Sequence, residues 1–216
     1  MFPKIKICCI SSLEEAEMAI NAGAAALGLV ARMPSGPGPI PDELIREIAA
    51  AIPPPIASFM LTSETSAKAI IAHHQRTQTN TIQIVDALEE GSYEEVRKAI
   101  PAVKLVQVIH VMDETSVEKA ITVSGMVDAI LLDSGNPNAV IKELGGTGRT
   151  HNWTLSRKIV ESINKPVFLA GGLHAGNVKQ AIEQVDPYGI DLCSSVRTDG
   201  KLDASKLQAF FKAVYR

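Results

Sequence analysis

KIKICCISS, residues 4–12, covers the predicted first strand and the turn that follows it. Successive side chains of a strand point to opposite faces, so Lys6 and Cys8 share one face, while Cys9 points outward against the helices. A dinucleotide-binding open sheet would carry a glycine fingerprint in this first turn, and CCISS (8–12) has none. The stretch therefore argues against a doubly wound open sheet, which is the main structural alternative for a chain of this pattern.

Short β-branched runs recur along the chain, and each is followed by a longer segment with helical apolar spacing. This alternation is typical of βα units in a parallel sheet. Strands are expected at 4–9, 25–30, 55–61, 81–85, 104–111, 128–133, 166–170 and 189–193. Helices are expected from Ser12 to Gly23 and at 41–51, 65–77, 93–100, 114–123, 153–163, 175–184 and 203–214. Without any linker between them, these units predict one α/β domain, a single (βα)8 TIM barrel over residues 1–216, with its active site at the C-terminal strand ends.

The composition argues against several classes of partner. The formal net charge is −3 and the basic residues are scattered, so we expect no nucleic-acid partner. The sequence has no basic leader, and charges or prolines interrupt its longest apolar runs, so we expect no membrane contact and a cytoplasmic protein. We expect a monomer or a homodimer. The three cysteines are expected to be free thiols in a reducing compartment.

In a barrel, strand-end residues that are far apart in the sequence meet at one mouth. Cys8 ends the first strand and Asp133 ends the sixth, and such a pair could exchange protons with a substrate. A structural role is also open for both, because a free cysteine is usually a small core residue and a carboxylate can cap a loop. Other polar residues expected at the mouth are Arg32, Gln83 and His110.

Glycines and serines gather at the ends of the last two strands. Gly171 and Gly172 precede a helix, while Ser194 and Ser195 follow the eighth strand. Backbone N–H groups and hydroxyls in this arrangement bind anions, as they do in the phosphate sites of such barrels. The glycine pair alone would also suit an ordinary tight turn. Together the two pairs predict a small-molecule phosphorylated substrate.

Several segments follow one another in the order KICCI (6–10), ALGLV (26–30), IQIVD (82–86), LLDS (131–134), GGTGRTHNW (145–153), AGGL (170–173) and DLCSSV (191–196). In this order they resemble the phosphoribosylanthranilate isomerase family of tryptophan biosynthesis. The resemblance covers essentially the whole chain. It implies an Amadori rearrangement of N-(5-phosphoribosyl)anthranilate, an aldose–ketose isomerisation, that needs no metal or organic cofactor.

The resemblance also implies roles for individual residues. Asp133 would be the general acid that protonates the ribose ring oxygen and opens the ring to a Schiff base. Cys8, as a thiolate, would be the general base that removes the C2 proton. Asp191 would lie near the ribose hydroxyls, and the GGTG loop at 145–148 would close over the substrate. The phosphate is expected at Gly146, Gly171, Gly172, Ser194 and Ser195.

The chain departs from the family pattern at the end expected to hold the anthranilate. Pro37 stands where the family has the arginine that meets the anthranilate carboxylate, and Val85 replaces a family histidine. A charged hydrogen-bonded contact of this kind is among the stronger ones in proteins. We therefore expect Arg32 or His110 to supply the missing cation, and Gln83 to contact the substrate beside them.

Two further departures lie near the phosphate end, where Ser195 replaces a family glycine and Arg197 replaces an acidic residue. Two alternatives to the leading interpretation stay open. One is a related isomerase that acts on a different N-linked ribose phosphate. The other is a non-catalytic barrel that binds a phosphorylated ligand.

Overall fold

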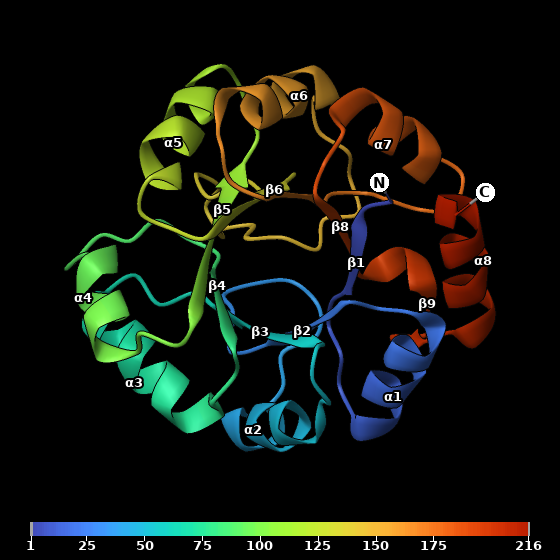
Figure 1. Ribbon diagram of the computed structural model, residues 1–216, viewed down its shortest axis with the longest axis horizontal. Coiled ribbons are helices and arrows are strands. Elements are labelled where there is room, and N and C mark those ends of the chain that lie inside the picture. The colour runs from blue at the N-terminus through green and yellow to red at the C-terminus, as the bar shows by residue number, and fades with distance from the viewer. Residues whose placement is uncertain (1, 216) are drawn as a thin grey trace.

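The computed structural model describes residues 2–215, in which a ring of helices surrounds a closed barrel of parallel strands (Figure 1). The barrel strands are β1 (Lys4–Ile7), β2 (Ala26–Val30), β3 (Ala57–Thr62), β4 (Thr81–Ile84), β5 (Lys104–His110), β6 (Ala129–Asp133), β7 (Val167–Leu169) and β8 (Gly189–Leu192). The helices are α1 (Leu13–Ala22), α2 (Asp42–Ala51), α3 (Ala67–Thr77), α4 (Tyr93–Ala99), α5 (Thr115–Ser124), α6 (Trp153–Ser162), α7 (Val178–Val185) and α8 (Ala204–Tyr215). Each strand pairs with the next along the chain, and β8 pairs with β1 to close the barrel.

The predicted barrel and its order of elements are confirmed. The largest shift among the helix starts is at α7, which was predicted from residue 175 and begins at Val178. A short 3-10 turn, η1 (Ser194–Val196), and the two-stranded hairpin of β9 (Arg197–Thr198) and β10 (Lys201–Leu202) were not predicted. These segments have two or three residues each, which is too short for a periodic pattern.

Local capping explains where several helices begin and end. Ser12, Ser66 and Ser92 each accept a hydrogen bond from the backbone N–H three residues later, at the start of α1, α3 and α4. Gly23 ends α1 with a φ of 106°, a left-handed conformation that glycine adopts without strain. These caps hold the helices in place against the strands, and so fix the strand ends where the site is built.

The core has two layers. The larger layer lies between strands and helices, and the smaller fills the barrel interior. Lys6 lies fully buried in that interior, with its Nζ 5.3 Å from the centre of the Phe59 ring. Gly28 makes room for it, because a Cβ at that position would lie 3.0 Å from Lys6 Nζ and 2.7 Å from Cys8 Sγ. The predicted inward direction of Lys6 and Cys8 is therefore confirmed.

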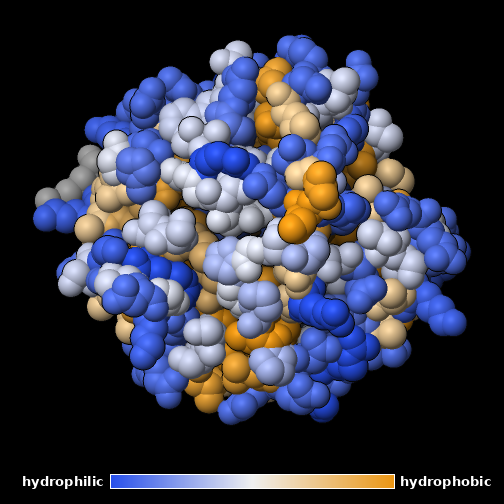
Figure 2. All heavy atoms as spheres, turned by 180° about the vertical axis from the view of Figure 1, so that it is seen from behind, coloured by the Kyte–Doolittle hydropathy of each residue, from blue (hydrophilic) through white to orange (hydrophobic). Residues whose placement is uncertain are grey.

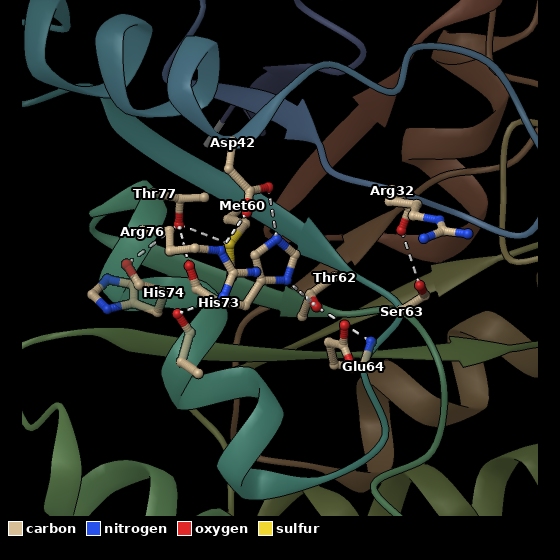
Figure 3. A network of polar contacts seen from close by, with 11 residues as sticks. Arg32, Asp42, Met60, Thr62, Ser63, Glu64, His73, His74, Arg76 and Thr77 are labelled. Atoms are coloured by element: carbon tan, nitrogen blue, oxygen red, sulfur yellow. Dashed lines mark hydrogen bonds and ion pairs between the residues drawn. The ribbon is translucent and has the colours of Figure 1, made fainter.

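A chain of polar contacts ties two helices to the barrel wall (Figure 3). Thr62 Oγ1 on β3 lies 2.9 Å from His73 Nδ1, and His73 Nε2 lies 3.1 Å from Asp42 Oδ1 at the start of α2. Arg76 Nε donates to Asp42 Oδ2 at 2.7 Å. Buried polar groups need such partners. These polar contacts fix α2 and α3 against β3.

The two chain ends lie on the same side of the barrel (Figure 1), where the rings of Phe2 and Tyr215 meet edge to face at a centroid distance of 5.2 Å. The opposite view shows a mostly hydrophilic or neutral surface with separate small apolar areas (Figure 2). Within residues 2–215, no helix combines the length and the apolar character that crossing a membrane requires.

Candidate active site

An open cavity of about 750 Å³, open solvent included, lies at the C-terminal ends of the barrel strands. The predicted site residues that line it are Cys8, Gln83, Asp133, Gly146, Gly171, Gly172, Asp191 and Ser194. The fold thus brings together residues that are up to 186 positions apart (Cys8 to Ser194, 194 − 8). Their chemical roles stay predictions.

Arg32, His110 and Ser195 are not among the lining residues. Arg32 is exposed just beyond β2, and its carbonyl accepts a hydrogen bond from Ser63 Oγ at 3.0 Å (Figure 3). The His110 ring is held by the Val85 carbonyl, 3.0 Å from Nε2, and burial lowers the pKa of His110. The Ser195 hydroxyl oxygen is buried and has no hydrogen-bond partner within residues 2–215.

Lys6 and Asp191 form a buried ion pair beneath the cavity, with 2.8 Å between Lys6 Nζ and Asp191 Oδ2. Burial alone would lower the pKa of Lys6, but the carboxylate of Asp191 raises it above the ordinary value. The other carboxylate oxygen, Asp191 Oδ1, is buried without a hydrogen-bond partner among the described residues. Because Asp191 also lines the cavity, this oxygen can accept a hydrogen bond from a bound hydroxyl.

Asp133 ends β6 and is buried. Burial raises the pKa of Asp133 to about 6, with a further contribution from the negative charge of Asp191. The backbone N–H of Ser134 opposes this shift, since it donates to Asp133 Oδ1 at 2.7 Å. At pH 7 a group with this pKa is protonated in roughly a tenth of the molecules. Asp133 can therefore both give and take a proton near neutral pH.

A glycine-rich loop covers the acid. Gly145, Gly146 and Gly148 have φ values of 138°, 67° and 68°, which lie in a region that residues with side chains seldom adopt. A Cβ on Gly145 would lie 2.7 Å from Asp133 Oδ2, and one on Gly146 would lie 2.6 Å from Pro37 Cδ. Glycine at these positions allows the loop to lie directly over the carboxyl group.

The glycine pair after β7 is covered in the same way. Gly171 and Gly172 have φ values of 82° and 60°. A Cβ on Gly172 would lie 2.7 Å from the Arg149 carbonyl carbon, so the loop after residue 148 packs on this backbone. Thr147 Oγ1 lies 2.7 Å from Ser134 Oγ and ties the loop to the end of β6. This side of the cavity is lined by backbone and small polar groups.

Apolar side chains form another part of the cavity lining, called the apolar side below. Its lining residues are Val30, Met33, Pro37, Leu61, Val85 and Leu144. No Arg, Lys or His within residues 2–215 lines the cavity on either side. An apolar wall without a cation fits a flat or aliphatic group better than it fits a carboxylate.

Cys9 was predicted to face the helices, and this prediction is wrong. Its φ of 62° is left-handed, which breaks the alternation of the strand at its end. Cys9 therefore lines the cavity, and its Sγ lies 2.6 Å from the Sγ of Cys193, which sequence analysis did not single out. Cys193 follows β8, and only the pairing of β1 with β8 brings the two thiols together.

Arg197 lies behind the turn that carries the two adjacent cysteines. Its Nη2 donates to the carbonyls of Cys8, at 3.3 Å, and Cys9, at 2.5 Å. Its Nη1 donates to Glu15 Oε1 at 2.9 Å, and both side chains are about nine-tenths buried. Arg197 thus holds the turn of Cys8 and Cys9 from outside the cavity. The sequence showed only that Arg197 replaces an acidic residue of the family, and it did not indicate that Glu15 is the partner of Arg197.

Comparison with known proteins agrees with this geometry. The family model described as N-(5'-phosphoribosyl)anthranilate (PRA) isomerase matches residues 5–213. N-(5'-phosphoribosyl)anthranilate isomerase 2 of Methanosarcina mazei is 33% identical over 209 residues, which cover 96% of this chain and 92% of that relative. The crystal structure of phosphoribosylanthranilate isomerase from Thermotoga maritima is 27% identical with a TM-score of 0.80, and the match covers 99% of this chain and 98% of that one.

A further solved phosphoribosylanthranilate isomerase holds reduced 1-(o-carboxyphenylamino)-1-deoxyribulose 5-phosphate. It is 26% identical to this chain with a TM-score of 0.77, and the match covers 99% of this chain and 98% of that one. The family model covers every strand end that lines the cavity, and the match to the curated relative covers 96% of this chain. This chain therefore belongs to the N-(5'-phosphoribosyl)anthranilate isomerase family of aldose–ketose isomerases.

Proposed function

We propose that this chain converts N-(5'-phosphoribosyl)anthranilate to 1-(o-carboxyphenylamino)-1-deoxyribulose 5-phosphate, with Asp133 as general acid and Cys8 as general base. One observation carries the proposal. A thiol and a carboxyl group with a pKa of about 6 line one cavity, between a glycine-rich side suited to phosphate and an apolar side suited to an aryl group. The ligand of a solved relative, a reduced form of this product, has those same parts, an aryl group, a sugar chain and a phosphate.

In the first step, protonated Asp133 gives its proton to the ribose ring oxygen. The bond from C1 to that oxygen breaks, and the nitrogen lone pair forms a C=N bond to C1, which leaves a protonated Schiff base and an Asp133 carboxylate. Burial favours the neutral acid before the step, and the Ser134 N–H stabilises the carboxylate afterwards. Lys6 supports the ionised state from below, since its charge acts on Asp133.

In the second step, the Cys8 thiolate removes the proton from C2. The electron pair of that C–H bond forms a C1–C2 double bond, and the C=N electrons return to nitrogen. The resulting enol then becomes the ketone when C1 takes up a proton and the C2 hydroxyl gives up its own, which leaves the C2=O double bond. Lys6 Nζ and Cys8 Sγ both pack against Gly28, where an added Cβ would lie 3.0 Å and 2.7 Å from them, so the ammonium lies near the sulfur where the thiolate forms.

The rest of the cavity would orient the substrate. The phosphate would lie at Gly146, Gly171, Gly172 and Ser194, with Asp191 Oδ1 accepting from a ribose hydroxyl. The aryl ring would pack on the apolar side, against Val85 and Leu144.

The test combines growth and kinetics. Expression of the chain should restore growth of a tryptophan auxotroph that lacks this isomerase, and the purified protein should convert phosphoribosylanthranilate. Cys8→Ala and Asp133→Asn should each lower kcat at least about a hundredfold, since general acid–base catalysis contributes roughly 10² to 10⁴. Asp128→Asn, at the other end of β6, is the matched control and should retain the wild-type kcat. Wild-type kcat in Cys8→Ala would remove the proposed base.

A second candidate is a related isomerase for another N-linked ribose phosphate. The cavity favours it at one point, because no cation lines the apolar side and Arg32 lies outside. The relative activity on two substrates distinguishes the two candidates. The anthranilate enzyme should prefer phosphoribosylanthranilate over its analogue with an unsubstituted phenyl ring, whereas the second enzyme should use the analogue equally well or better.

A further inference from the structure

Two thiols from opposite ends of the chain touch at the mouth of the cavity. Cys9 follows β1 and Cys193 follows β8, and their Sγ atoms lie 2.6 Å apart. The pairing of β1 with β8 continues up to this contact, because the Cys8 N–H donates to the Leu192 carbonyl at 2.8 Å. The contact is therefore set by the closing strands of the barrel and not by a loose loop.

Three features hold Cys9 in this position. Its left-handed backbone, with a φ of 62°, turns the side chain toward Cys193. Arg197 Nη2 donates to its carbonyl. Gly38 makes room for it, since a Cβ there would lie 2.6 Å from Cys9 Cβ. A left-handed non-glycine residue is uncommon and persists only where its surroundings hold it.

The two thiols differ in how easily they ionise. The hydrogen bond with Cys9 lowers the pKa of Cys193 against the effect of burial, and the guanidinium of Arg197 lowers it further. The same contact with Cys193, together with burial, raises the pKa of Cys9. Cys193 is also partly exposed, whereas Cys9 is buried. Because the thiolate is the nucleophile in disulfide exchange, Cys193 is the attacking sulfur.

We propose that Cys9 and Cys193 form a reversible modification site, at which a small-molecule disulfide such as glutathione disulfide is exchanged for a Cys9–Cys193 disulfide. The Cys193 thiolate attacks one sulfur of the small disulfide, forms a mixed disulfide and releases one small thiolate. That thiolate takes the proton of Cys9, whose sulfur then attacks Cys193 and releases the second small thiolate. Two protein thiols lose two electrons in total, and one small disulfide is reduced to two thiols.

The geometry requires little movement for this exchange. The pairing of β1 with β8 already places the two sulfurs in contact, so no strand has to move. The exchange uses two thiols that the proposed mechanism does not need and leaves Cys8 reduced. Its readout is covalent, so the result is independent of which substrate the enzyme turns over.

The experiment treats the full-length protein with glutathione disulfide and then alkylates the remaining thiols. Two of the three cysteines should be lost to alkylation. Trypsin should yield a linked pair of peptides, one beginning at Ile7 and one ending at Arg197, which dithiothreitol separates. The Cys8→Ala variant contains only the proposed pair and should form the same bridge as the wild type.

The matched control is Cys9→Ala, which keeps Cys8 and Cys193 and should form no internal bridge. Fragmentation of the linked wild-type peptides between residues 8 and 9 gives the same answer if Cys9→Ala does not fold. The proposal is overturned if Cys9→Ala forms a bridge as readily as Cys8→Ala. It is also overturned if Cys8→Ala ends with two free thiols or with stable glutathione adducts only.

Discussion

Arg197 and Glu15 form a buried ion pair that connects the segment after β8 to the first helix, and the same guanidinium donates to the carbonyls of Cys8 and Cys9. Both carboxylate oxygens of Glu15 accept hydrogen bonds from Arg197, and they also accept from the backbone N–H groups of Ser11 and Leu202. The pair therefore joins α1, the turn of Cys8 and Cys9, and the hairpin of β9 and β10.

Removing one partner of this pair should be costly. Arg197→Ala leaves the Glu15 carboxylate buried without its cation, and we expect the free energy of unfolding to fall by about 3 kcal/mol. Glu15→Gln should be destabilising as well, and the double variant should lose less than the sum of the two single losses. Urea denaturation at pH 7 measures all three. Strict additivity would show that the two side chains do not interact.

The raised pKa of Asp133 predicts how stability changes with pH. The pKa of Asp133 is about 6 in the folded protein and ordinarily 3.8, so between these pH values the folded protein keeps a proton that the unfolded chain has lost. The free energy of unfolding of the wild type should therefore fall relative to that of Asp133→Asn as the pH rises from about 4 to 6. Above pH 6 the gap between the two proteins should stay constant. We expect a final difference on the order of 1 to 3 kcal/mol. Urea titrations at several pH values give the curve. The raised pKa would be contradicted if the wild type gained stability relative to Asp133→Asn between pH 4 and pH 6.

The same group sets the expected pH dependence of turnover. If ring opening by protonated Asp133 limits kcat/KM, then kcat/KM should fall as the pH rises above about 6, because the free enzyme loses the acid form. Initial rates across pH 5 to 9 measure this limb. In Asp133→Asn the residual kcat/KM should no longer fall over this pH range. A limb that persists in the variant would belong to another group.

Gly145 should be needed for turnover. Alanine there is strained at a φ of 138°, and its Cβ would lie 2.7 Å from Asp133 Oδ2. Gly145→Ala should therefore lower kcat/KM at least about tenfold, since small misplacements of catalytic groups are expensive. Gly200→Ala is the matched control, because Gly200 also has a positive φ but has nothing within 4 Å of the added Cβ. Equal activity of the two variants would show that the loop does not need to approach Asp133.

An arginine at position 37 should restore recognition of a carboxylate. Pro37 lines the apolar side of the cavity, and a charged hydrogen bond contributes roughly 1.5 to 3 kcal/mol, or about ten- to a hundredfold in affinity. Pro37→Arg should lower KM for phosphoribosylanthranilate and leave that of the carboxyl-free phenyl analogue unchanged. Arg32→Ala tests whether the exposed Arg32 replaces the missing arginine in the wild type. If it does, the variant should have a raised KM for phosphoribosylanthranilate and an unchanged KM for the phenyl analogue.

The order of strands and helices could be predicted from the sequence because it rests on local periodicity and on the known geometry of βα units. The same reasoning placed Cys8, Asp133 and Gly171 at one mouth, since all parallel strands of a barrel end on the same side. It failed at Cys9, because alternation assumes extended backbone and nothing in the sequence marks a cysteine with a positive φ. The partners of Arg197 and Cys193 depend on how the first and last strands meet, which no local pattern contains.

Pairing of the first strand with the last also decides when the enzyme can become active during synthesis. Lys6 is made 185 positions before its counter-ion, Asp191. A nascent chain that lacks β8 would have to leave the interior ammonium hydrated or uncompensated, which disfavours a closed barrel. Arg197, which fixes the turn of Cys8 and Cys9, emerges later still. The cavity lined by Cys8 therefore cannot take its final form until β8 and Arg197 have been made, long after Cys8 itself.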